Sequence, residues 1–134
     1  MVVNVGSPAA LACHGLGKTF SSGSRVIQAL DGIDLTVTPG RITGLIGPDG
    51  AGKTTLMRLA AGLLRADAGE LRVLDLDVSR EPLAVQSAIG YMPQRFGLYE
   101  DLSVQENLDL YADLQGVMDA ERRGRHAALM HMVG

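Results

Sequence analysis

The 134-residue sequence has a single cysteine and no tryptophan, and neither sign of charge dominates it. With only Cys13, no intrachain disulfide framework and no zinc or iron–sulfur site built from several cysteines can form, which fits a reducing compartment. There are 12 Lys and Arg residues against 15 Asp and Glu, a net charge of -3. The overall charge therefore gives no reason to expect binding to nucleic acid or to an anionic membrane.

Long hydrophobic runs are also absent. The most apolar stretch, Leu56–Leu64, is interrupted by Arg58 and is far shorter than the ~20 residues of a spanning helix. The first 13 residues lack a basic start, and Ser7-Pro8 breaks their apolar part, so no signal peptide is expected. A strand beginning near Ala9 is the better interpretation.

The chain is rich in glycine instead, with 17 among 134 residues, whereas about 7% is usual. Its length matches one domain of ~100–150 residues, and its 46% hydrophobic content argues against disorder. Glycine in excess marks backbone that turns tightly or approaches a ligand closely. The position of the glycines is therefore the main clue to function.

Strand-like and helix-like segments alternate in the first part of the chain. Asp31-Gly32 separates Val26–Leu30 from Ile33–Val37, which predicts a hairpin. Arg41–Ile46 has the pattern of a buried strand, and Ala88–Met92 that of another. Further predictions are a helix with Leu56, Leu59, Ala60 and Leu63 on one face, a strand at Glu70–Leu74 and a short helix opening at Glu81-Pro82.

The composition changes after residue 93. From Ser103 onward there is no strand pattern and no proline. Ser103 and Glu106 form a capping box that predicts the start of a helix ending near Gly116, and Asp119 is expected to cap a second helix. We therefore divide the chain into residues 1–93 and 94–134.

The glycines concentrate in a segment that fits G-x-x-x-x-G-K-[ST] at every fixed position. Glycines let successive N–H groups point inward around a polyphosphate, and the following helix adds positive potential. Lys53 supplies a charge for the β- and γ-phosphates, and Thr54 offers a hydroxyl to Mg²⁺. The candidate residues are Gly47, Pro48, Asp49, Gly50, Ala51, Gly52, Lys53, Thr54 and Thr55.

A second G-K-T, in Gly15–Thr19, does not meet the same standard. The first glycine of the pattern would fall on Ala12, and no helical pattern follows. We interpret this segment as a strand end and turn.

The order of motifs resembles the ATP-binding cassette family over nearly the whole chain. Gly90-Tyr91-Met92-Pro93-Gln94 is similar to the strand and Q-loop of that family, and Leu102–Leu108 to the entry of its helical subdomain. Phe96-Gly97-Leu98-Tyr99 resembles the branch that exports drugs and polysaccharides. The resemblance implies that Phe20 stacks on adenine and that Gln94 contacts Mg²⁺ and the attacking water. A core phenylalanine and a polar strand end remain the alternatives.

The sequence departs from the family pattern at several points. Asp49 replaces an asparagine in the phosphate loop, which weakens affinity mildly, and Asp75 replaces a turn glycine with little expected consequence. No L-S-G-G-Q-type signature, no apolar strand ending in Asp-Glu and no histidine after a further strand is present. His126 and His131 lie about 140° apart on a helix, so we interpret them as solvated rather than as a metal pair.

These observations predict an α/β fold: a RecA-like P-loop NTPase core with an antiparallel β-element, a parallel core sheet and the start of an α-helical subdomain, incomplete at its C-terminus. The resemblance implies an ATP-binding subunit that uses ATP and Mg²⁺ to power export. Its partners would be a transmembrane permease and a second ATP-binding domain, at the inner face of the cell membrane. Without the missing motifs we expect binding but no hydrolysis by this chain alone. Alternatives are a soluble ATPase of the family, a non-catalytic ATP-binding stub, or a P-loop kinase or GTPase, for which no Asn-Lys-x-Asp is found.

Overall fold

The computed structural model describes residues 9–94 and 97–133, which form two compact units, one up to Tyr91 and one from Met92 onward. The start of the chain, where no signal peptide is expected, and Phe96 of the exporter-like stretch lie outside the described residues. In the described ranges, no helix combines the length and the apolar character that crossing a membrane requires.

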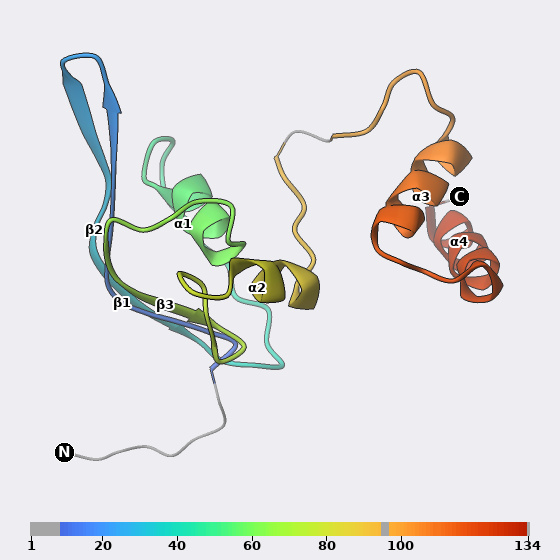
Figure 1. Cartoon of the computed structure of the whole chain (residues 1–134), viewed down its shortest axis with the longest axis horizontal. Coiled ribbons are helices and arrows are strands. Elements are labelled where there is room, and N and C mark those ends of the chain that lie inside the picture. The colour runs from blue at the N-terminus through green and yellow to red at the C-terminus, as the bar shows by residue number, and fades with distance from the viewer. Residues whose placement is uncertain (1–8, 95–96, 134) are drawn as a thin grey trace. The chain divides into compact units, whose positions relative to one another are not determined.

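The first unit is built on a four-stranded antiparallel sheet (Figure 1). Its strands are β1 (Leu11–Ser22), β2 (Arg25–Val37), β3 (Ala68–Val73) and β4 (Leu76–Asp77), in the order β2-β1-β3-β4. The antiparallel β-element is thus confirmed. The expected parallel core sheet is not found within residues 9–94 and 97–133, where every strand pairing is antiparallel.

The predicted hairpin at Asp31-Gly32 is wrong, because β2 runs through both residues as one strand. The chain reverses instead at Gly23, whose φ is 59°. Between the pairs Leu16↔Ile33 and Lys18↔Leu30, β2 carries one residue more than β1. Gly32, with φ 60°, therefore serves a β-bulge, which uses the same left-handed glycine as a turn.

The segment Gly15–Thr19, interpreted as a strand end and turn, lies in the middle of β1. Gly15 has φ 57° at a register shift, so it bends the strand without ending it. A Cβ on Gly69 of β3 would lie 2.3 Å from the carbonyl oxygen of Gly15. Glycine at positions 15 and 69 thus permits close contact between two strands.

Helix α1 (Lys53–Ala60) packs on β2 and β3 through its predicted apolar face, and helix α2 (Pro82–Ala88) begins at its proline, as predicted. The α1 helix ends before Leu63, which is exposed, because Gly62 adopts φ 65° and the N–H of Leu63 donates to Arg58 O at 2.9 Å. The shared core consists of Cys13, Leu16, Leu30, Leu56, Leu59, Ala60, Leu71, Val73, Val78 and Val85.

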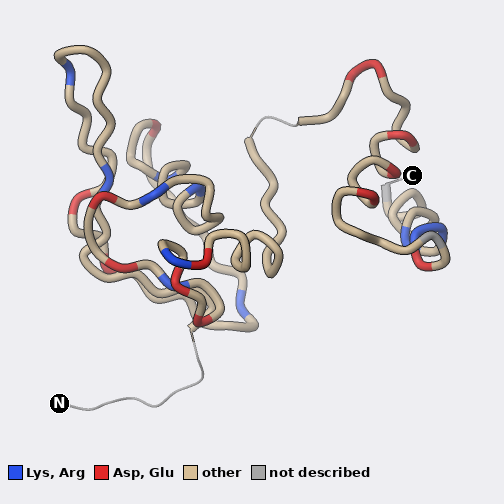
Figure 2. Tube along the Cα trace, in the orientation of Figure 1, with Lys and Arg blue, Asp and Glu red and all other residues tan. Residues whose placement is uncertain are grey.

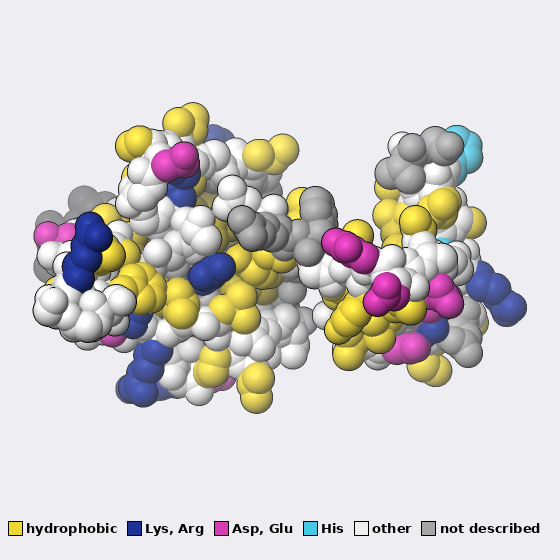
Figure 3. All heavy atoms as spheres, turned by 90° about the horizontal axis from the view of Figure 1, so that it is seen from above, with side chains coloured by type: hydrophobic (Ala, Val, Ile, Leu, Met, Phe, Trp, Pro, Cys, Tyr) yellow, Lys and Arg dark blue, Asp and Glu magenta, His cyan; other side chains and the backbone are white. Residues whose placement is uncertain are grey.

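Two predicted strands are not formed. Residues Arg41–Ile46 belong to no strand, and Ile42 and Ile46 are 104% and 95% exposed. Ala88 ends α2, and the residues from Ile89 to Met92 likewise belong to no strand. A strand needs a neighbour for its N–H and C=O groups, and no described strand lies beside either segment. Hydrophobic side chains consequently lie on the surface (Figure 3).

The second unit contains helices α3 (Val104–Leu114) and α4 (Asp119–Val133). The predicted capping box is confirmed: Ser103 Oγ accepts from the N–H of Glu106, whose carboxylate accepts from the N–H of Ser103 at 2.8 Å. Gly116, with φ 67°, follows the end of α3, also as predicted. Asp119, the expected cap of the second helix, is instead its first residue. The residue before the helix is Met118, whose carbonyl accepts from the N–H of Arg122 at 3.0 Å.

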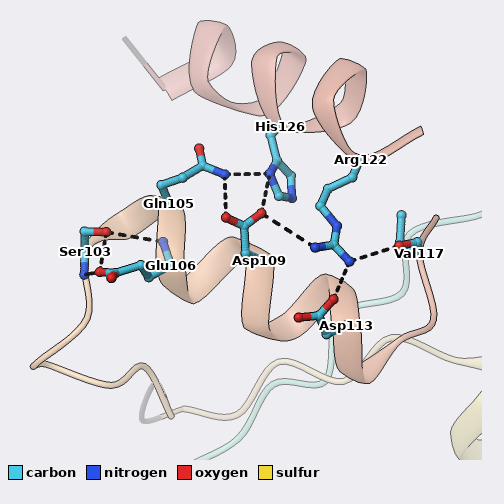
Figure 4. A network of polar contacts seen from close by, with 8 residues as sticks. All are labelled: Ser103, Gln105, Glu106, Asp109, Asp113, Val117, Arg122 and His126. Atoms are coloured by element: carbon cyan, nitrogen blue, oxygen red, sulfur yellow. Dashed lines mark hydrogen bonds and ion pairs between the residues drawn. The ribbon is translucent and has the colours of Figure 1, made fainter. Parts of the chain in front are cut away.

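Acidic residues of α3 face basic residues of α4 (Figures 2 and 4). Arg122 Nη2 lies 2.5 Å from Asp113 Oδ1, and His126 Nδ1 lies 3.5 Å from Asp109 Oδ1 and 3.0 Å from Gln105 Nε2. The side chain of His126 is only 11% exposed, so its interpretation as a solvated histidine is wrong. The contacts of His126 with Asp109 and Gln105 of α3 accompany the burial of its side chain.

Candidate functional site

The glycine-rich segment Gly47–Gly52 forms an exposed loop that leads directly into α1. Gly50 and Gly52 have φ values of 81° and 82°, in the left-handed region that side chains rarely adopt. The N–H of Ala51 donates to Pro48 O at 3.3 Å, which closes the loop into a tight turn. The backbone thus has the conformation for which the sequence pattern selects glycine.

The side chain of Lys53 folds back across this loop. Its ammonium group donates to the carbonyl oxygens of Gly47 at 2.7 Å and Pro48 at 2.6 Å. Both acceptors are neutral and exposed to water, so a charged phosphate oxygen is a stronger partner for the same ammonium group. The ammonium group of Lys53 therefore lies beside the start of the loop, where it can bind an anion.

The N-terminus of α1 faces the same loop. Gly52 is its N-cap, and among the described residues no side chain caps it. Its first N–H groups have no carbonyl partner within the helix and together with the helix dipole favour an anion. Thr54 is exposed and Thr55 is partly buried at this first turn. The hydroxyl of Thr54 is thus accessible to a cation that accompanies a phosphate.

Phe20 lies on β1 near the tip of the β1–β2 hairpin, opposite Ile27. Its side chain is 39% exposed, which disfavours the alternative of a core phenylalanine. The backbone of Gly52 packs against β2 at Ala29 and Leu30, and Leu30 pairs with Lys18 on β1. Phe20 is two residues farther along β1, about 7 Å, so the first unit brings an exposed aromatic ring and the phosphate loop to the same hairpin.

Gln94 belongs to the second unit, where it is exposed and precedes residues outside the described range.

The sequence patterns did not identify Asn107, a residue that holds the segment from Tyr99 to Ser103 against α3. Asn107 is 7% exposed, and its Nδ2 donates to the carbonyls of Tyr99, Leu102 and Ser103 at 3.0–3.1 Å. Its Oδ1 accepts from the N–H of Tyr99 at 2.9 Å. A polar residue early in an amphipathic helix was the available signal.

Other candidate sites are weaker. A cavity of about 630 Å³ lies between the end of α1, β3, β4 and the start of α2. None of the phosphate-loop residues lines it, so it is not the candidate nucleotide site. Within the described ranges, no three His, Cys, Asp or Glu side chains are placed to hold a metal ion.

Comparisons with known proteins show the family of the chain. The family model described as "ABC transporter" matches residues 30–134, which include the whole phosphate loop. The chain is 48% identical over 122 residues to "Probable multidrug ABC transporter ATP-binding protein YbhF" of Escherichia coli (strain K12), which covers 91% of this chain and 21% of that protein. It is also 38% identical to "Lipopolysaccharide export system ATP-binding protein LptB" of the same organism, over 86% of this chain and 47% of LptB.

Relatives named for import match as well. "Methionine import ATP-binding protein MetN" of Corynebacterium diphtheriae (strain ATCC 700971 / NCTC 13129 / Biotype gravis) is 40% identical, over 90% of this chain and 37% of that protein. Among solved structures, "Dimeric Structure of MJ0796, a Bacterial ABC Transporter Cassette" matches with a TM-score of 0.79 at 26% identity, over 91% of this chain and 56% of that one. The chain thus spans between about a fifth and half of these three relatives' length.

Proposed function

We propose, from the premise that this chain belongs to the ABC transporter family, that it binds Mg²⁺·ATP at the loop Gly47–Thr55. The observation that carries the proposal is the position of Lys53, whose ammonium group spans the loop and donates to two neutral carbonyls, its partners within residues 9–94 and 97–133. Exchange of these neutral partners for β- and γ-phosphate oxygens would replace them with a stronger, charge-assisted interaction. The uncapped N-terminus of α1 supports the same assignment.

The residues present also fit Mg²⁺ bound together with ATP. The exposed hydroxyl of Thr54 would hold the ion. The resemblance to the family is the basis for proposing Gln94 as a second contact of the ion. When bound, Mg²⁺ neutralises charge on the phosphate oxygens. Asp49 in the loop would weaken the affinity mildly, because its carboxylate and the phosphates carry charges of the same sign.

Phe20 would stack on the adenine ring. The partial exposure of its side chain, on the same hairpin that contacts Gly52, supports this role. Stacking of a base on an aromatic side chain is sequence-tolerant because every base presents a π-face. The contact therefore contributes affinity for the base without depending on a particular hydrogen-bond pattern.

The chain would act as an ATP-binding subunit for a membrane permease, peripheral to the inner face of the membrane and paired with a second ATP-binding domain. The names of the relatives support the permease, and the dimeric cassette supports the second domain. The direction that we propose is export, because Phe96-Gly97-Leu98-Tyr99 resembles the exporting branch of the family. Among the relatives, LptB is named for export and MetN for import, so their names do not decide the direction. Because the 134 residues hold no signature, Asp-Glu strand or switch histidine, ATP would be bound but not hydrolysed by this chain alone.

Titration calorimetry of the 134-residue chain with Mg²⁺·ATP tests the proposal. Lys53→Ala should weaken binding by about 2–5 kcal/mol, the usual cost of removing one partner of a close charge pair. Arg58→Ala is the matched control, because it removes a cation from the opposite end of the same helix. Equal affinity of Lys53→Ala and the parent chain would refute the phosphate site, and turnover of ATP that Lys53→Ala abolishes would refute the absence of hydrolysis.

A further inference from the structure

Lys18 joins a carboxylate to the candidate adenine-stacking ring. Its Nζ lies 2.8 Å from Asp67 Oδ1 and 5.5 Å from the centroid of the Phe20 ring. The Lys18 side chain is only 15% exposed, so this ammonium group is held in place rather than free in solvent. The contact brings together residues 49 positions apart in sequence.

Asp67 is itself fixed by the end of the sheet. Strand β3 begins at Ala68, and the N–H of Asp67 donates to Gly17 O at 3.0 Å. Beyond that point β1 has no residue of β3 beside it, although β2 continues on its other side, and Asp67 Oδ2 accepts from the N–H of Thr19 at 2.7 Å. The carboxylate thus replaces the missing strand with one oxygen and holds Lys18 with the other. These hydrogen bonds, that of Lys18 above all, keep the pKa of Asp67 below its usual range.

We propose that Lys18 and Asp67 are positioning residues for the adenine ring: Asp67 anchors Lys18, and Lys18 holds Phe20 with one face against its ammonium group. The opposite face of the ring is then the one on which a base stacks. The proposal deepens the proposed function, since it rests on the stacking role of Phe20. A ring held in one orientation loses less conformational freedom on binding than a free one.

Separate measurements with Mg²⁺·ATP and Mg²⁺·tripolyphosphate test the proposal, because only ATP carries a base. Lys18→Met should weaken ATP about fivefold, as expected for a partly desolvated cation–π contact, and change tripolyphosphate less than about twofold. Lys18→Arg should restore ATP binding. Arg25→Met is the matched control, since it removes an exposed cation from the same hairpin and should change neither constant.

Asp67→Asn separates positioning from long-range electrostatics. The amide keeps an oxygen for the N–H of Thr19 but no charge for Lys18. If these residues act only through their charge, Lys18→Met should weaken anion binding and Asp67→Asn should strengthen it. Positioning predicts that both variants weaken ATP relative to tripolyphosphate.

Phe20→Trp gives a readout without nucleotide, because the chain has no other tryptophan. In that background Lys18→Met should alter the emission, and Arg25→Met should not. Equal losses for ATP and tripolyphosphate, or no loss of ATP, would overturn the inference alone. If Lys53→Ala leaves tripolyphosphate binding unchanged, the proposed phosphate site fails first, and this inference fails with it.

Discussion

Gly52 lies so close to Ala29 that a Cβ placed on Gly52 would stand 2.4 Å from the carbonyl oxygen of Ala29. The same Cβ would lie 2.8 Å from a methyl group of Leu30. Gly52 also has φ 82°, so two independent constraints require glycine here. The contact fixes the start of α1, and with it Lys53, against β2.

Gly52→Ala should therefore destabilise the first unit more than Gly50→Ala. Both positions have a positive φ, which costs about 1–2 kcal/mol for a residue with a side chain. A Cβ on Gly50 would have no atom within 4 Å, so only Gly52→Ala adds a clash with backbone. Urea unfolding of the two variants measures the difference. Equal destabilisation would show that α1 is not seated on β2 in this way.

Phe20→Ala should weaken Mg²⁺·ATP by about 1–3 kcal/mol, the usual contribution of one stacked base, and leave tripolyphosphate unchanged. Phe20→Trp should retain ATP affinity and report binding by quenched fluorescence. Titration calorimetry and fluorescence provide the two measurements. If Phe20→Ala binds ATP with the affinity of the parent chain, Phe20 does not stack on adenine and has only a structural role.

Asn107→Ala should release the segment from Gly97 to Ser103 from α3. The side-chain amide of Asn107 makes four hydrogen bonds there. Each buried partner left without a hydrogen bond costs about 1–3 kcal/mol of stability. Hydrogen exchange of the N–H of Tyr99 should rise, and thermal stability of the second unit should fall. Val104→Ala, which truncates an exposed side chain on the same helix, should change neither.

The capping box of α3 should make the second unit sensitive to acid. Hydrogen bonds from the side chain and then the backbone of Ser103 lower the pKa of Glu106. Because the pKa of Glu106 is lower in the folded state, its contribution to stability is complete above the pKa of the unfolded chain, about 4.3. The contribution is lost as the pH falls through the lower pKa of the folded state.

The difference in melting temperature between the parent chain and Ser103→Ala should consequently narrow as pH falls below about 4. Glu106→Gln supplies the control, since glutamine keeps the capping box without a titrating group. In that background, the effect of Ser103→Ala should not depend on pH. Circular dichroism at a series of pH values tests both expectations, and a difference that stays constant in the parent chain would contradict them.

Local pattern alone predicted the features that depend on neighbours in sequence. The spacing of Gly47, Gly52 and Lys53 predicted the loop and the helix that follows it, and Ser103 with Glu106 predicted the start of α3. In each case the atoms that interact lie within a few residues, so their geometry follows from backbone conformation and short side chains.

The tertiary structure decided the features that need a distant partner. Asp31-Gly32 suits a turn or a bulge equally, and only pairing with β1 made it a bulge. Arg41–Ile46 has the composition of a strand but lacks a described neighbour to satisfy its backbone, so it stays unpaired. Lys18 reaches Asp67 because β1 and β3 are adjacent in the sheet. No local pattern encodes that adjacency, since it arises from burial of the shared core.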